Sequence, residues 1–94
     1  MGATPVVRLR RDFDDQAILE MIVWRVPVPV VGCSHHYRYR LFYGYPGARL
    51  IGYDNEPPKG DHKHIENRQE PYVFTDVERL VADFLADVNR RRLR

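Results

Sequence analysis

The chain has 94 residues, which is enough for one domain, and its composition of 44% hydrophobic and 30% charged residues is typical of a soluble globular protein. No apolar run approaches the ~20 residues that span a bilayer, and residues 1–5 lack the features of a signal peptide, so we expect a cytoplasmic protein without a membrane partner. The single cysteine, Cys33, excludes an intrachain disulfide. A domain this small buries a modest core, which makes a binding partner or a homodimer a reasonable expectation.

The net charge of +2 is unevenly distributed along the chain. Four arginines lie in residues 90–94, so the preceding residues carry 11 basic against 13 acidic side chains. Overall basicity is therefore no argument for nucleic-acid binding, and only local placement of charge can support it.

The first half of the chain reads as strands. Residues 5–13 alternate apolar and polar side chains, which indicates a half-buried strand. Residues 17–26 are almost continuously apolar and β-branched, which favours a second strand over the alternative of a helix. Pro27 and Pro29 cannot donate ladder hydrogen bonds, so we expect the second strand to end there.

Two further strands follow. Residues 35–43 alternate strongly, with one face formed by Tyr37, Tyr39, Leu41 and Tyr43 and the other by His36, Arg38, Arg40 and Phe42. Residues 44–47 form a turn, and residues 48–53 return as the next strand. Short hairpin connections predict an antiparallel meander.

The C-terminal segment predicts a helix over residues 75–90. Thr75 and Glu78 match a capping box, and the apolar residues recur at helical spacing: Val77, Leu80, Val81, Phe84, Leu85 and Val88. Only the sheet can cover this stripe, so we expect the helix on one sheet face. For the basic tail 90–94, a frayed and solvated helix end is favoured over attraction to nucleic-acid phosphates.

The predicted fold is a single α+β domain over residues 1–94. It has an antiparallel meander of about four to five strands, with its sheet in residues 5–53. A polar loop over residues 54–70 then leads to the C-terminal helix. This loop holds Asp54, Lys59, Asp61, His62, Lys63 and His64. Such protonatable groups on a loop that a scaffold holds are a functional hint, because no core requires them.

The loop offers the groups needed to cleave RNA. That reaction requires a base for the 2′-hydroxyl, an acid for the leaving oxygen and cations for the charge on phosphorus. His62 and His64 suit the proton transfers. The cations would be Lys59, Lys63, Arg38 and Arg40, and unpaired bases could stack on Tyr37, Tyr39, Tyr43 or Tyr53. The alternatives are a solvated His-x-His segment and tyrosines that belong to the core.

A metal site is a second possibility for the same loop. His62 and His64 point the same way in an extended segment, and Asp61 or Asp54 could complete a ligand set. The pattern lacks the paired spacing of a zinc finger, so the sequence assigns no metal and no cofactor. Asp54 and Asn55 more often cap a turn than bind an ion.

Three motifs together resemble the TumE family of bacterial toxins: residues 36–40 (His-Tyr-Arg-Tyr-Arg), 53–55 (Tyr-Asp-Asn) and 62–64 (His-Lys-His). The likeness covers roughly residues 35–88. It implies a cytoplasmic growth inhibitor that is neutralised by a helix-turn-helix antitoxin. Residues 56–61 are shorter than the corresponding loop of many relatives and lack its further histidines.

Residues and resemblance together predict a metal-independent endoribonuclease acting on cellular RNA. His62 and His64 would be the acid and base, Asp54 would orient a histidine, and Lys59 would hold phosphate. The expected RNA-binding residues are Arg38, Arg40, Lys63, Tyr39 and Tyr53. Two alternatives remain open: a non-catalytic module that blocks a ribosomal or enzyme site, and a metal-dependent hydrolase or transferase that uses the His-x-His loop.

Overall fold

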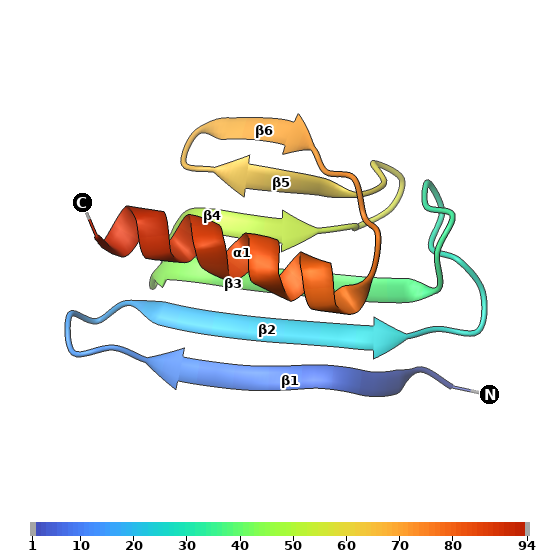
Figure 1. The fold of residues 1–94 in the computed structure, drawn as a ribbon, viewed down its shortest axis with the longest axis horizontal. Coiled ribbons are helices and arrows are strands. Elements are labelled where there is room, and N and C mark those ends of the chain that lie inside the picture. Colours follow the sequence, from blue (N-terminus) through green and yellow to red (C-terminus); the bar gives the residue numbers. More distant parts are fainter. Residues whose placement is uncertain (1, 94) are drawn as a thin grey trace.

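The computed structural model describes residues 2–93 as one six-stranded antiparallel sheet and one helix (Figure 1). The elements are β1 (Thr4–Asp12), β2 (Ile18–Arg25), β3 (Tyr37–Tyr45), β4 (Ala48–Asp54), β5 (His62–Ile65), β6 (Arg68–Pro71) and α1 (Val77–Arg92). The strands lie in the sheet in chain order, so the predicted α+β meander with a C-terminal helix is confirmed. No helix within residues 2–93 has the length and apolar character needed to cross a membrane.

The hairpin of β5 and β6 is where the structure departs from the predicted polar loop over residues 54–70. His62 pairs with Asp54 on β4 and with Pro71 on β6, so the sheet has more strands than predicted. Both strands are only four residues long and mostly polar. They lack the apolar alternation by which strands are recognised, and pairing with the open edge of β4 stabilises them instead.

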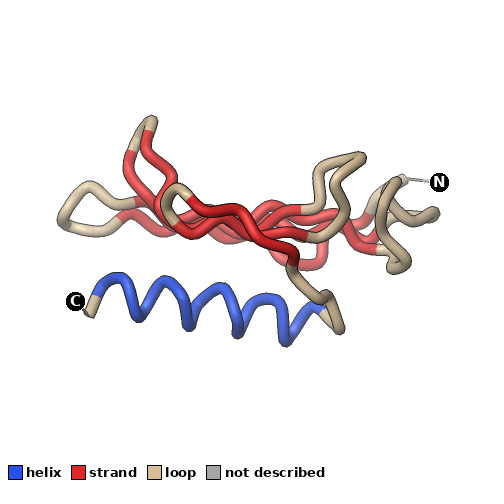
Figure 2. The backbone as a smooth tube through the Cα atoms, turned by 90° about the horizontal axis from the view of Figure 1, so that it is seen from above, coloured by secondary structure: helices blue, strands red, loops and turns tan. Residues whose placement is uncertain are grey.

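Helix α1 covers one face of the sheet and leaves the other face open (Figure 2). Its N-cap is Asp76, whose carboxylate accepts a hydrogen bond from the backbone N–H of Arg79 at 2.7 Å, so the predicted cap at Thr75 is one residue too early. Leu80, Phe84 and Val88 are buried against the sheet.

The core lies between α1 and alternate residues of the strands. Its sheet side consists of Leu19, Met21, Val23, Tyr39, Leu41, Tyr43, Ile51 and Tyr53. Because successive strand side chains point to opposite faces, the intervening residues face away from the helix. Among them are Ile22, Trp24, Arg38 and Arg40, which lie on the open face.

The arginines after residue 89 belong mainly to the helix. The Arg92 guanidinium lies 3.9 Å from the centre of the Phe13 ring and donates a hydrogen bond to the hydroxyl of Tyr43 at 2.8 Å. The prediction of a frayed end is therefore wrong for Arg92, which anchors the last turn. Arg94 lies outside the described residues.

Candidate functional site

Asp54, His62 and His64, here named the Asp54 cluster, meet on the open face of the sheet. Nε2 of His62 lies 2.9 Å from Oδ1 of Asp54, and Nε2 of His64 lies 4.0 Å from Oδ2. The two imidazole rings are 5.1 Å apart between centroids. Antiparallel pairing of β4 with β5 puts Asp54 opposite His62, and alternation puts His64 on the same face.

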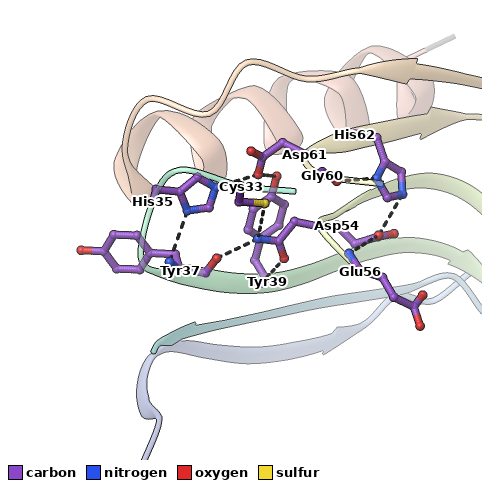
Figure 3. A network of polar contacts seen from close by, with 10 residues as sticks. Cys33, His35, Tyr37, Tyr39, Asp54, Glu56, Gly60, Asp61 and His62 are labelled. Carbon is purple, nitrogen blue, oxygen red and sulfur yellow. Dashed lines mark hydrogen bonds and ion pairs between the residues drawn. The ribbon is translucent and has the colours of Figure 1, made fainter. Parts of the chain in front are cut away.

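His62 is held from both sides of its ring. Its Nδ1 lies 2.8 Å from the carbonyl oxygen of Gly60 (Figure 3), and a carbonyl can only accept, so Nδ1 carries a proton and donates it. Nε2 faces the Asp54 carboxylate. The second contact is a hydrogen bond when either Nε2 or the carboxyl group carries a proton. With only 5% of its surface exposed, His62 has a defined orientation.

His64 has a different electrostatic environment. Burial lowers its pKa, and the positive charge of Arg49 and the neighbouring His62 lower it further, against an opposing effect of Asp54. The neutral imidazole is therefore favoured at His64. The cluster thus offers one imidazole bonded through both nitrogens and one that is available as a proton acceptor.

Arg49 can lie near His64 because residue 52, the cross-strand partner of His64, is glycine. A Cβ atom at Gly52 would lie 2.6 Å from Cδ of Arg49, so the arginine side chain occupies the space that a larger residue would fill. The sequence analysis did not identify Arg49. A glycine at an alternate position of a strand, two residues before Asp54, is the signal that could have pointed to a close approach there.

Two loops cross beside the cluster and fix the Gly60 carbonyl. Gly32 and Gly60 have φ angles of 94° and 77°, which favour glycine. A Cβ at Gly32 would lie 2.6 Å from the carbonyl oxygen of Pro58, and one at Gly60 would lie 2.8 Å from the carbonyl oxygen of Gly32. The close contact of the two backbones therefore positions the acceptor that orients His62.

Asn55 fixes the end of β4 from within the protein. It is completely buried; its Oδ1 accepts a hydrogen bond from the backbone N–H of Tyr39 at 3.0 Å, and its Nδ2 donates one to the carbonyl of Tyr37 at 2.7 Å. Asp54 accepts a hydrogen bond from the backbone N–H of Glu56 at 3.2 Å, in line with the predicted turn-capping role.

Arginines surround the cluster on the open face. Arg40 is the cross-strand partner of Asp54, and Arg38 is the partner of Trp24. A hollow of about 500 Å³ lies among these side chains; its lining is Ile22, Trp24, Arg38, Tyr39, Arg40, Arg49, Asp54 and Glu56. The sequence analysis missed Trp24, although its position out of phase with the buried Met21 and Val23 indicates the opposite face.

A family model described as Toxin TumE matches residues 3–92, from the start of the sheet to the last turn of α1. The chain belongs to the TumE toxin family. The resemblance predicted from the three motifs is confirmed, and the match extends over β1 and β2, which carry none of those motifs. Neither a curated protein nor a solved structure matches the chain.

Membership in the TumE family makes this chain the toxin component of a pair, and it implies an antitoxin as the partner. The hollow, the two histidines and the arginines are thus features of a toxin's exposed sheet face. Most side chains on the face covered by α1 form the core.

Several residues expected at the RNA site of this TumE-family toxin lie elsewhere. Tyr39 and Tyr53 are 3% and 1% exposed beneath α1, which does not fit the prediction that they stack on bases. Lys63 points to the helix side, where its Nζ lies 3.6 Å from Asp87. Lys59 is exposed on the loop, and its charge contributes to the lowered pKa of His64.

A second polar group, Cys33, His35 and Asp61, stabilises the loops of this TumE-family chain (Figure 3). Asp61 Oδ1 accepts hydrogen bonds from the Tyr39 hydroxyl at 2.6 Å and from His35 Nε2 at 2.8 Å. Burial raises the pKa of the Cys33 thiol, and the nearby Asp61 carboxylate raises it further, so the thiol is poorly suited to nucleophilic chemistry. Asp61 is therefore not part of the Asp54 cluster, contrary to one of the expectations.

Proposed function

We propose that this toxin is an endoribonuclease that cleaves cellular RNA without a metal ion, at the Asp54 cluster. The observation that carries the proposal is that one carboxylate contacts both imidazoles on a sheet face lined with arginines. A base, an acid and cations for the phosphate are the three parts that the reaction requires.

The two histidines have different roles in this reaction. Neutral His64 takes the proton from the 2′-hydroxyl, whose oxygen then attacks phosphorus and forms a cyclic phosphate. Protonated His62 transfers its Nε2 proton, which faces Asp54 before the reaction, to the departing 5′-oxygen, while Nδ1–H stays bonded to the Gly60 carbonyl and holds the ring. The lowered pKa of His64 supports its assignment as the base.

The arginines and Trp24 provide the binding surface for the substrate. Arg38, Arg40 and Arg49 bring positive charge to the phosphates next to the cluster. Trp24 lies in the same hollow and replaces the buried Tyr39 and Tyr53 as the stacking platform for an unpaired base. The substrate is therefore RNA in a single-stranded region, such as part of an mRNA or tRNA.

The biological setting follows from the family. We propose that the antitoxin is a helix-turn-helix protein and that the toxin acts in the cytoplasm, where its substrate is found. RNA cleavage that stops translation would account for growth inhibition, and antitoxin binding would relieve it. Self-association as a homodimer stays a prediction that size exclusion with light scattering would check.

The test compares purified proteins on total RNA. The double variant His62→Ala/His64→Ala should cleave at least about 100-fold more slowly than the wild type, because it lacks both proton-transfer groups. His36→Ala removes an exposed imidazole outside the cluster and should cleave normally.

Thermal unfolding of each variant checks that it is folded. The single variant His64→Ala is the milder change, because His62 is more deeply buried than His64. Equal cleavage by the wild type and the double variant would contradict the proposal. So would growth arrest by a wild type that cleaves no RNA, which would indicate a blocking module instead.

A further inference from the structure

We infer that Asp54, His62 and His64 form a binding site for a transition-metal ion of the zinc class. Their ligand atoms all lie within 4.8 Å of one another, and the three residues come from two adjacent strands of a rigid sheet. This inference rests on the geometry of the cluster and does not depend on RNA cleavage. A bound ion would occupy both imidazoles, so it would stop proton transfer by them.

The distances fit a tetrahedral ion. Zinc binds nitrogen and oxygen at about 2.0–2.2 Å, which puts neighbouring ligand atoms about 3.4 Å apart. The three ligand atoms, one from each residue, all lie within 4.8 Å of one another. The nearest approaches of the two histidines to Asp54 lie on either side of about 3.4 Å, although they involve different carboxylate oxygens: 2.9 Å from Oδ1 to His62 Nε2, and 4.0 Å from Oδ2 to His64 Nε2.

The hydrogen bond of His62 selects the tautomer that a metal requires. A histidine that binds a metal usually donates its other ring N–H to a carbonyl or carboxylate. Nδ1 of His62 donates to the Gly60 carbonyl at 2.8 Å, which leaves the lone pair of Nε2 for an ion at the Asp54 cluster. The close contact of the Gly32 and Gly60 backbones fixes the Gly60 carbonyl, and with it the hydrogen bond from His62 Nδ1, before any ion binds.

The same criterion excludes the group of Cys33, His35 and Asp61, whose ligand atoms also lie within 4.8 Å of one another. Nδ1 of His35 accepts a hydrogen bond from the backbone N–H of Tyr37 at 3.2 Å. The proton of neutral His35 therefore sits on Nε2, the nitrogen that faces Asp61. That nitrogen cannot bind a metal without losing the contact with Tyr37. Of the two candidate groups within residues 2–93, the Asp54 cluster is therefore the one whose hydrogen-bonded histidine, His62, has the suitable tautomer.

The ligand set points to zinc or cobalt rather than magnesium. Two imidazoles and one carboxylate suit Zn²⁺ and Co²⁺, whereas Mg²⁺ takes oxygen ligands. Three protein ligands leave a fourth position open. Arg38, Arg40 and Arg49, which line the hollow next to Asp54, oppose a cation at the cluster, but they favour an anionic fourth ligand on that cation.

The experiment titrates the full chain, after treatment with a chelator, with Zn²⁺, Co²⁺ and Mg²⁺ in the absence of RNA. Calorimetry should show one Zn²⁺ per chain with a dissociation constant in the micromolar range or below, and no binding of Mg²⁺. Asp54→Ala and His64→Ala should each weaken Zn²⁺ binding at least about tenfold. Cys33→Ser and His36→Ala should bind Zn²⁺ like the wild type.

Two further measurements test the metal site without relying on the variants of the Asp54 cluster, which could fail to fold. Zn²⁺ should raise the unfolding temperature of the wild type and of Cys33→Ser, and Co²⁺ should give the visible absorption of a tetrahedral site. Absence of Zn²⁺ binding, or equal affinity in Asp54→Ala, His64→Ala and the wild type, would overturn the inference.

An RNA assay separates this inference from the proposed function. Zn²⁺ should inhibit cleavage by the chelator-treated wild type. Cleavage that occurs only with Zn²⁺ would support the metal site and overturn the metal-free mechanism. Metal-free cleavage by a protein that binds no Zn²⁺ would overturn the metal site and leave the proposed function intact.

Discussion

At the scale of single residues, Asn55 shows how a buried amide supports the candidate site. Its side chain bonds the backbones of Tyr37 and Tyr39 on β3, and it directly follows Asp54 in the chain. These bonds replace the strand pairing that ends at Asp54, the partner of Arg40. The position of the Asp54 carboxylate therefore depends on a neighbour that has no chemical role of its own.

Asn55→Ala should lower the free energy of unfolding by about 3 kcal/mol, because a buried N–H and a buried carbonyl each lose a partner at about 1–3 kcal/mol. Urea denaturation measures this change. Asn89→Ala, at an exposed helix position, should stay within about 0.5 kcal/mol of the wild type. An unfolding midpoint of Asn55→Ala equal to that of the wild type would show that the amide bonds contribute nothing.

At the scale of elements, α1 is tied to the segment that connects it to β6. The hydroxyl of Tyr72 donates to Oδ2 of Asp83 at 2.7 Å, and Nε of Arg79 donates to Oδ1 at 2.9 Å. Burial acts to raise the pKa of Asp83, but these hydrogen bonds outweigh it and hold the pKa below its ordinary value of 3.8.

A lowered pKa in the folded state makes this contact dependent on pH. The stabilisation is complete above the ordinary pKa of a carboxyl group and is lost as the pH falls through the lower folded value. Asp83→Asn should therefore lower the free energy of unfolding by about 1 kcal/mol at pH 7. The difference from the wild type should shrink as the pH falls below 3.8.

Urea denaturation at neutral and acid pH measures the effect. Asp14→Asn, at an exposed turn, is the matched control and should show no comparable difference. A destabilisation by Asp83→Asn that is as large at acid pH as at neutral pH would show that the charge of Asp83 is not responsible.

At the scale of the whole molecule, the sheet separates structural and functional residues onto its two faces. Helix α1 covers one face only (Figure 2). The face beneath α1 holds the core, whereas the open face combines the Asp54 cluster with arginines and Trp24. Substitutions on the open face should therefore change RNA binding with little effect on the free energy of unfolding.

Arg38→Ala should weaken binding of a single-stranded RNA whose 2′-hydroxyls are blocked, and it should reduce the salt dependence of the affinity. Loss of one phosphate contact lowers the slope of log affinity against log salt by about 0.7 for a single strand. Arg68→Ala, which removes an exposed arginine paired with Glu70 on the far edge strand, is the control. If the slope of log affinity against log salt were the same for Arg38→Ala and the wild type, Arg38 would not contact an RNA phosphate.

The sequence predicted most of the fold because β1 to β4 and α1 carry clear periodicity. The apolar stripe of α1 predicts a helix that buries this side, and the alternation of β3 predicts a strand with two distinct faces. Residues 62–71 were predicted as loop because their strands are short and polar. For such segments, pairing with a neighbouring strand decides the conformation, and local pattern carries little information.

The sequence by itself determined the antiparallel meander, the amphipathic helix, the family and the set of polar groups available near residues 53–64. Only the tertiary structure decided which groups meet, because the pairing of β4 with β5 brings Asp54 to His62 and His64 and turns Lys63 away. It also decided that Tyr39 and Tyr53 are core. Alternation defines two faces of a strand, but only the packing of α1 determines which of them is buried.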